Sequence, residues 1–425
     1  KNQVDSDKIG GKLVADGYEA ASDPSSADLV VVNTCAFVEE ARQESIDTVL
    51  ALSDDRADGA SVVVTGCMAE RYGDELAAAL PEVDTVAGFG KAFAEPASSP
   101  RRSLIPVTSA PVPTFDLLNL PRPASASPWA YVKIAEGCDR NCGFCAIPSF
   151  RGPQRSRAIE DIAAEVEALG AREIVLVAQD LAAFGRDQGV GERAIVPLVR
   201  RVNDLVDRVR LLYLYPSDLT EELIEAMLAT GVPYFDLSLQ HVSPPLMRRM
   251  RRWGNGDKFL ERIERIRTLE PDAAFRSNFI VGYPGETEAD HDALLRFVEA
   301  AQLDWCGFFG FSDEEGTYAH TLDGHVDPDL MDDRLAELRE LQDGITASRR
   351  DALIGREVTV LVDAPGEGRT FREAPEIDGI VTVPDTLEPG RFHTVRVIDA
   401  QGPDLVAEPV LEPSAAGPSP RGADS

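Results

Sequence analysis

The stretch that organises this sequence runs from Tyr131 to Pro148 and reads YVKIAEGCDRNCGFCAIP. Its first five residues are a strand candidate. Three cysteines, Cys138, Cys142 and Cys145, follow on the next loop with the spacing C-x3-C-x2-C. They cannot all pair with one another as disulfides, because an odd number leaves one thiol free. Thiolates are soft ligands that suit zinc or an iron–sulfur cluster.

The ligand count favours the cluster over zinc. Structural zinc sites generally have four Cys or His ligands. This loop has no fourth Cys or His close by, and the nearest downstream candidate is His241. Three ligands would leave one iron of a four-iron cluster open to bind a substrate. An iron–sulfur cluster is therefore our first interpretation, and zinc or a chance grouping of thiols are the alternatives.

A βα rhythm extends from this loop over residues 130–312. Helical patterns over 158–170, 217–231 (with Asp218 as the N-cap) and 287–302 lie between six strand candidates. Six βα units predict a parallel sheet curled into a barrel, and eight are needed to close the common βα barrel. We therefore expect an open, incomplete (β/α)6 barrel. The strand candidates are Tyr131–Ala135, Glu173–Ala178, Arg210–Tyr215, Tyr234–Leu239, Phe275–Val281 and Trp305–Phe311.

The segment before the barrel predicts a smaller parallel α/β domain. Apolar runs at 29–32 and 62–64 alternate with helical stretches, as in a parallel sheet covered on both faces. Cys35 and Cys67 follow these two runs, and the carboxyl ends of parallel strands open onto one crevice. From the residues alone, a buried core role is the more ordinary interpretation of two isolated cysteines, and metal binding is the alternative.

The sequence pattern changes after the barrel. Residues 331–353 predict one long linking helix, and alternating or β-branched stretches at 357–362, 379–383 and 392–398 predict a small antiparallel β unit. Residues 96–128 are rich in proline and predict a linker. We expect domains at 1–115, 128–353 and 354–412, followed by a disordered tail at 413–425.

Charge and hydropathy limit the functional class. The chain has 42 Lys or Arg against 73 Asp or Glu, a formal net charge of −31. That balance argues against a broad nucleic-acid surface, which needs a surplus of cations. No stretch is long and apolar enough to span a bilayer, and the residues from Lys1 onward hold no apolar signal core. We expect a cytoplasmic protein with no membrane partner.

The cysteine loop carries a resemblance to a known superfamily. Residues 137–148, with Phe144 before the last cysteine, resemble the radical S-adenosylmethionine (SAM) signature. The continuation to Pro153 resembles the methylthiotransferase family specifically. Further motifs of that family follow in order at Asp180, at 239–241, at 280–287 and at 314–317. The resemblance covers nearly the whole chain.

The resemblance implies a cofactor set. Cys138, Cys142 and Cys145 would hold a [4Fe-4S] cluster whose open iron binds SAM. Further SAM contacts would come from Phe144, Gln240, Ile280 and Gly282. Gly282 could instead merely turn a strand into a helix. His241 is expected to be structural, with a catalytic role as the alternative. Residues 248–252 hold four arginines, which we interpret as a solvated helix face, with substrate contact as the alternative.

Methylthiotransferases carry a second [4Fe-4S] cluster held by three cysteines of the N-terminal domain. The resemblance assigns Cys35 and Cys67 to two of these positions. Residues 1–6 resemble the segment just after the family's first ligand, so the resemblance implies the third cysteine about two residues before Lys1. Cys306 matches no ligand position and is predicted to be a core thiol.

Two branches of the family act on different substrates. One modifies an adenosine of transfer RNA, and the other modifies the β-carbon of an aspartate in small-subunit ribosomal protein twelve. The terminal β unit resembles the family's substrate-recognising TRAM domain, a small antiparallel β-barrel. From Glu357 to Ser425 it has 13 Asp or Glu against 5 Arg and no Lys. Such a module would repel phosphates and attract a basic ribosomal protein.

We therefore predict methylthiolation of the ribosomal protein. Residues 369–379 also resemble that branch. Modification of transfer RNA is the alternative, and a non-catalytic iron–sulfur protein that binds ribosomes is less favoured. The resemblance also implies an electron donor such as flavodoxin or ferredoxin.

Overall fold

The computed structural model describes residues 1–89, 116–189 and 194–410. The chain divides into two units, Lys1–Gln342 and Asp343–Ser425, and the division falls within helix α11 (Pro328–Asp351). Most of the predicted linker at 96–128 and all of the predicted tail at 413–425 lie outside the described residues. The three-domain division stays a prediction. None of the described helices has both the length and the apolar character needed to cross a bilayer.

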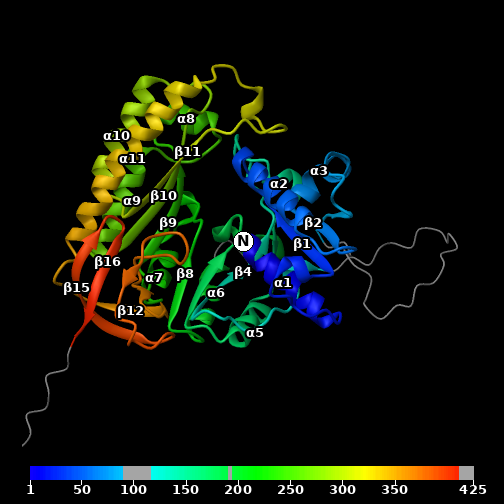
Figure 1. Cartoon of the computed structure of the whole chain (residues 1–425). Helices are drawn as coiled ribbons and strands as arrows, with labels where there is room; N and C mark the ends of the chain where they lie inside the picture. Colours follow the sequence, from blue (N-terminus) through cyan, green and yellow to red (C-terminus); the bar gives the residue numbers. More distant parts are fainter. Residues whose placement is uncertain (90–115, 190–193, 411–425) are drawn as a thin grey trace, which may run out of the picture. The chain divides into compact units, whose positions relative to one another are not determined.

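A parallel sheet of three strands opens the first unit (Figure 1). Its order is β1 (Leu29–Thr34), β2 (Ser61–Gly66) and β3 (Thr85–Ala87). Three helices pack on it: α1 (Asn2–Ala15), α2 (Glu39–Asp54) and α3 (Cys67–Ala79). The valines of β1 and β2 form the core of this region, because β-branched side chains fit a sheet covered by helices. The predicted N-terminal parallel α/β fold is confirmed.

Six further parallel strands form two arcs of three. One arc has the order β4 (Trp129–Lys133), β7 (Glu173–Val177) and β8 (Arg208–Leu211). The other consists of β9 (Tyr234–Gln240), β10 (Ala274–Val281) and β11 (Trp305–Gly310). A parallel bridge between Leu214 and Leu237 joins the arcs. Over the described residues β4 pairs with β7 and β11 with β10, but not with each other, so the predicted open barrel is confirmed.

The barrel helices alternate with these strands, as Figure 1 shows. They are α5 (Ile159–Leu169), α6 (Ile195–Asn203), α7 (Glu221–Leu228), α9 (Gly256–Leu269) and α10 (Glu288–Ala301), with two shorter helices, α4 (Ile147–Arg151) and α8 (Pro244–Arg249). A two-stranded ribbon, β5 (Ala135–Glu136) with β6 (Arg155–Ser156), follows β4. Short 3-10 turns lie at Pro24–Ser26, Leu117–Asn119, Leu181–Ala183, Arg186–Gln188, Pro216–Asp218 and Ala319–Thr321.

Helix ends match the prediction in part. Gly170 follows α5 in the left-handed conformation with φ 66°, as expected of a residue just past a helix end. The prediction of Asp218 as an N-cap was wrong. Thr220 caps α7 by accepting a hydrogen bond from the Leu223 amide, because the Asp218 carboxylate is bound to Arg140. That helix also ends at Leu228, before Gly231.

The second unit is a closed barrel of five strands. Their order is β12 (Glu357–Ala364), β13 (Glu367–Arg369), β14 (Val381–Thr382), β16 (Asp404–Pro409) and β15 (Phe392–Gln401). Inward-facing valines such as Val360, Val362 and Val395 form its core. The pairings are antiparallel, as predicted, except that β14 and β16 run parallel. The predicted small β-barrel is confirmed.

Candidate functional site

The three cysteines of the signature lie on a loop whose two ends are held together. The loop leaves β5 and returns through α4 to β6, and these two strands pair antiparallel. The Cys138 amide donates to the Gly152 carbonyl oxygen at 3.1 Å. Arg151 Nη1 binds the Glu136 carboxylate at 2.8 Å, one residue before the loop begins at Gly137. The base of the cysteine loop is therefore fixed by backbone pairing and by a salt bridge.

Two glycines in this loop leave no room for a side chain. Gly137 has φ +77°, and a Cβ there would lie 2.1 Å from the Pro153 carbonyl oxygen. Gly143 donates its amide to the Met250 oxygen at 2.8 Å and accepts from the Ala319 amide at 2.7 Å. A Cβ on Gly143 would lie 2.8 Å from the Tyr283 hydroxyl. The loop is therefore pressed closely against the segments that follow α8 and β11.

The three thiols lie close enough to influence one another. Burial raises the pKa of Cys138 to about 11 and that of Cys145 to about 12, and the nearby Cys142 sulfur raises both. Cys138 and Cys145 are therefore protonated at neutral pH and would release protons on binding iron. Within the described ranges, no group of three Cys, His, Asp or Glu side chains is arranged to hold a metal ion. Cluster ligands lie further apart, since each thiolate binds a different iron, and a set of three soft thiols fits such a cluster.

Arg140 lies within the cysteine loop and ties it to the barrel. Its amide donates to Cys138 Sγ at 3.4 Å, while its guanidinium binds Asp180 and Asp218. The guanidinium also lies over the Tyr215 ring, 3.9 Å from the centroid. Burial opposes its charge, but the two carboxylates keep the pKa of Arg140 above its ordinary value. This arginine therefore anchors the loop between its first two cysteines.

The prediction of a solvated arginine face after β9 was wrong for Arg252. The chain turns at Arg251, where φ is 53°, and Arg252 points back to the cysteine loop. Arg252 Nη1 donates to Cys142 Sγ at 3.4 Å, and its guanidinium lies 3.9 Å from the Tyr215 ring centroid. Arg249 is half-buried and donates to the Asp323 carbonyl oxygen at 3.3 Å. Arg248 and Arg251 are exposed, as predicted for all four.

Two of the predicted SAM contacts, Gln240 and Ile280, lie at the carboxyl ends of neighbouring strands. Gln240 ends β9 and is paired in register with Phe279 of β10. Ile280 follows in β10, and it packs with Phe144 against one apolar cluster formed by Leu246, Met250, Tyr283 and Ala319. The structure thus brings Phe144 and Ile280 to the same cluster. Their contact with the cofactor, and that of Gln240, stays a prediction.

Gly282 fulfils a backbone requirement just after β10. Its φ is +79°, and a Cβ there would lie 2.5 Å from Met331 Sδ. Its amide donates to the Glu286 carboxylate at 2.6 Å. The turn alone therefore explains a glycine here, and its role in cofactor binding stays a prediction.

Cys35 and Cys67 follow the ends of adjacent parallel strands. Thr34 of β1 and Gly66 of β2 are partners in the sheet, and each cysteine comes directly after one of them. Burial raises the pKa of Cys35, and the nearby Cys67 sulfur adds to the effect. Gly66 has φ +93°, and a Cβ there would lie 2.3 Å from Asn33 Oδ1. The strand ends therefore place the two thiols near one another, as the topology predicts, although a role as ligands stays a prediction.

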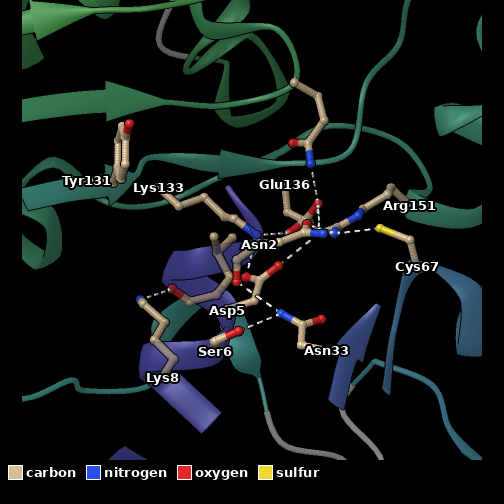
Figure 2. Close-up of polar contacts among 12 residues, drawn as sticks. Asn2, Asp5, Ser6, Lys8, Asn33, Cys67, Tyr131, Lys133, Glu136 and Arg151 are labelled. Carbon is tan, nitrogen blue, oxygen red and sulfur yellow. Dashed lines mark hydrogen bonds and ion pairs between the residues drawn. The ribbon is translucent and has the colours of Figure 1, made fainter. Parts of the chain in front are cut away.

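Arg151 connects the two groups of cysteines, a role that sequence reasoning missed. Its Nη2 donates to Cys67 Sγ at 2.9 Å, while Nη1 binds Glu136 at the base of the cysteine loop (Figure 2). Burial alone would raise the pKa of Glu136, but ion pairs with Lys133 and Arg151 hold that pKa at about 2. The position of Arg151 within the 137–153 motif was its only signal in the sequence.

Glu314 forms a second link between the N-terminal helices and the barrel. Its buried carboxylate accepts hydrogen bonds from Arg42 at 2.6 Å and from Arg71 at 2.8 Å. Burial opposes its charge, but the Ser312 hydroxyl and the two guanidinium groups hold the pKa of Glu314 below its ordinary value. The motif at 314–317 therefore joins α2 and α3 to the segment after β11.

The remaining residues singled out from the sequence, His241 and Cys306, lie within the first unit. His241 is fully buried, and its Nδ1 accepts a hydrogen bond from the Ser243 amide at 3.1 Å. Burial lowers the pKa of His241 to about 4, so the ring is neutral at pH 7. Cys306 lies in β11, where burial raises the pKa of its thiol.

The buried histidine predicts a loss of stability in acid. The folded pKa of about 4 lies below the ordinary 6.5, so the unfolded chain binds a proton more readily. Stability from His241 is present above pH 6.5 and is lost towards pH 4, by about 3 kcal/mol at most. Asn at this position keeps an acceptor for Ser243. When the pH is lowered from about 7.5 to about 5, we expect the melting temperature of His241→Asn to fall less than that of the parent. Equal losses in anaerobic thermal melts would contradict this.

Comparison with known families divides the chain into three matched regions. Residues 1–88 match uncharacterized protein family UPF0004, residues 132–298 match the radical SAM superfamily, and residues 354–410 match the TRAM domain. The first contains Cys35 and Cys67, and the second contains Cys138, Cys142 and Cys145.

Individual relatives resemble nearly the whole chain. Ribosomal protein uS12 methylthiotransferase RimO of Saccharopolyspora erythraea is 43% identical over 454 residues, which cover 96% of this chain and 93% of that protein. The enzyme of the same name from Streptomyces coelicolor is 41% identical, covering 97% and 95% of the two chains. That of Cutibacterium acnes is 40% identical and covers 96% of each. The chain therefore belongs to the RimO family of radical SAM methylthiotransferases.

Proposed function

We propose that this enzyme adds a methylthio group to the β-carbon of an aspartate in ribosomal protein uS12, the small-subunit protein twelve. The relatives at 40–43% identity carry uS12 in their names. The observation that carries the proposal is the link through Arg151, which contacts Cys67 and also closes the loop of Cys138, Cys142 and Cys145. Such a link suits an enzyme that must combine radical formation with sulfur transfer.

The radical SAM match implies a [4Fe-4S] cluster and SAM. We propose Cys138, Cys142 and Cys145 as the ligands of this cluster. When bound, the cluster and SAM supply a radical that takes a hydrogen atom from an unactivated carbon, which no side-chain base could deprotonate at neutral pH. We further propose that Cys35 and Cys67 are two ligands of a second [4Fe-4S] cluster associated with the transferred sulfur.

The residues around the cysteine loop would bind and orient SAM. Phe144 and Ile280 supply an apolar wall, and Gln240 supplies a polar group on the neighbouring strand. Asp180 is buried, and its Oδ1 has no hydrogen-bond partner among the described residues. This oxygen lies in the carboxylate that anchors Arg140, so it offers an acceptor beside the loop for a donor group of the cofactor.

The surface of the second unit supports a basic protein as the substrate. Within residues 354–410, two arginines are buried, Arg369 and Arg372, and Arg369 is bound to Asp363. They therefore contribute little positive charge to the surface. Seven acidic side chains are exposed against three arginines within 354–410: Glu357, Glu367, Glu376, Asp385, Glu388, Asp399 and Glu408, with Arg356, Arg391 and Arg396. An acidic surface attracts a basic ribosomal protein and repels RNA.

Two further elements complete the proposal. The cluster that starts the reaction needs electrons one at a time, so we propose a small electron-transfer protein such as flavodoxin or ferredoxin as the donor. Action on a ribosomal protein places the enzyme in the cytoplasm.

A deletion strain tests the substrate choice. We expect uS12 from that strain to lack the methylthio group, and the transfer RNA pattern to be unchanged, when both are analysed by mass spectrometry. A plasmid carrying the parent gene should restore the mark, whereas one carrying Cys138→Ala should not. Loss of a methylthio mark from transfer RNA with the uS12 mark intact would reverse the assignment.

A further inference from the structure

Arg151 lies between the two cysteine groups, and all of its contacts are within the first unit. We infer that Arg151 is a positioning residue that couples the two cluster sites, closing the radical SAM loop with one guanidinium nitrogen and holding the Cys67 sulfur with the other. This inference rests on the proposed second cluster at Cys35 and Cys67. It assigns to Arg151 a role in setting the electron affinity of that cluster.

The first half of this role concerns the cysteine loop. Arg151 ends α4, the helix that follows Cys145. Its Nη1 binds Glu136 Oε1 at 2.8 Å, and Gln179 Nε2 donates to the same oxygen at 2.7 Å. The Glu136 carboxylate lies directly before Gly137, so its position determines where the loop begins. Arg151 therefore fixes both ends of the loop relative to each other.

The second half concerns the N-terminal region. Arg151 Nη2 donates to Cys67 Sγ at 2.9 Å and lies 3.3 Å from Asn2 Oδ1, and Nη1 lies 3.3 Å from Asp5 Oδ2. The guanidinium is also 4.3 Å from the Phe89 ring centroid. Its side chain is only 3% exposed, so water screens these interactions little. Figure 2 shows the guanidinium between Glu136 and Cys67.

The charge balance around Arg151 explains why it would affect a cluster. Two buried cations, Lys133 and Arg151, face two carboxylates, those of Asp5 and Glu136. The two positive and two negative charges cancel, leaving aside any charge on Cys67. A thiolate at Cys67 and its cluster would add negative charge beside the Arg151 guanidinium, whose Nη2 donates to Cys67 Sγ. Hydrogen bonds to cluster sulfurs and nearby positive charge favour the reduced state.

Lys133 provides a matched control in the same network. It is as buried as Arg151 and binds both Asp5 and Glu136 (2.8 Å for the latter). Its ammonium has no contact with Cys67 among the described residues. If Arg151 were only one part of an interface salt bridge, removing either cation would have the same effect. If Arg151 acts on the cluster, replacing it should change the midpoint potential much more than replacing Lys133 does.

The test uses the full-length enzyme, reconstituted anaerobically with iron and sulfide. Cys138, Cys142 and Cys145 are all replaced by alanine, so that only the second cluster is observed. The midpoint potential is then measured by redox titration followed by electron paramagnetic resonance. We expect Arg151→Gln to make reduction at least tenfold less favourable, a shift of about 59 mV to lower potential. Arg151→Lys should shift it in the same direction by less, and Lys133→Gln should shift it least.

The outcomes separate this inference from the proposed function. An unchanged potential in Arg151→Gln, or an equal shift in Lys133→Gln, overturns the role of Arg151 while leaving the second cluster in place. Absence of iron from the triple-alanine parent overturns the second cluster itself. If Arg151→Gln fails to fold, because it leaves buried carboxylates unpaired, Arg151→Lys keeps the charge balance and decides the matter. An unchanged potential there overturns the inference.

Discussion

Replacing Gly137 with alanine should leave the radical SAM loop almost free of iron and abolish SAM cleavage. The new Cβ would lie 2.1 Å from the Pro153 oxygen and 2.6 Å from the Gly152 oxygen, and both are backbone atoms. The positive φ of +77° adds about 1–2 kcal/mol of strain for an L-residue. The loop must therefore move at its first residue, directly before Cys138. Iron content and visible absorbance after reconstitution measure the effect.

Gly170→Ala is the matched control for this prediction. Gly170 has a similar φ of +66°, but a Cβ there meets nothing within 4 Å. It therefore incurs the backbone strain without the collision. We expect this variant to lose about 1 kcal/mol of stability and to bind iron as the parent does. Normal iron loading in Gly137→Ala would show that the loop does not depend on the close approach to Pro153.

The second large effect concerns the separation of the two chemical steps. We expect Cys67→Ala to abolish methylthio transfer while SAM is still cleaved to 5′-deoxyadenosine. The loss of a ligand should exceed the roughly 10–100-fold cost of changing a residue that only supports one. Cys67 lies in the N-terminal sheet region, whereas the proposed radical cluster depends on the loop at 138–145. Both products can be measured from one reaction mixture.

Cys306→Ala controls for the general effect of removing a cysteine. Cys306 lies in β11 and is not part of either proposed ligand set. We expect this variant to form both products at nearly the parent rate. Transfer that survives in Cys67→Ala, or is lost equally in Cys306→Ala, would remove the reason for assigning Cys67 to a cluster.

The strands were predictable because their signals are local. Valine runs mark β1 and β2, and each of the strands from β7 to β11 overlaps its expected range. Strand β8 is shorter than expected and ends at Leu211, since Tyr213 adopts φ 66° and leaves the extended conformation. Strands β3 and β13 have three residues each, too few for a pattern to develop, whereas β14 (Val381–Thr382) falls within the β-branched stretch predicted at 379–383.

Helix α1 could not be predicted, because its buried face is partly charged. Pattern recognition looks for an apolar stripe, but α1 buries Asp5 and Lys8 together with Val4 and Ile9. Their partners lie far away in the sequence: Lys133 is 128 positions from Asp5, and Glu165 is 157 positions from Lys8. Only the tertiary structure shows that these charges are paired and therefore tolerated inside.

The candidate site also has a part that the sequence predicts and a part that only the tertiary structure shows. The spacing of Cys138, Cys142 and Cys145 is a local signal that indicates a cluster. The contacts of Arg151 with Cys67 and of Arg252 with Cys142 join residues 84 and 110 positions apart. No sequence pattern specifies them, because each depends on how separate elements of the first unit pack together.

The most direct test of the account is a reaction with purified components. Full-length enzyme, reconstituted anaerobically, is incubated with uS12, SAM and a one-electron reductant, and the products are analysed by mass spectrometry. We predict that uS12 gains one methylthio group in place of hydrogen on a single aspartate and that 5′-deoxyadenosine accumulates. Unmodified uS12 alongside a methylthiolated adenosine in added transfer RNA would contradict the account.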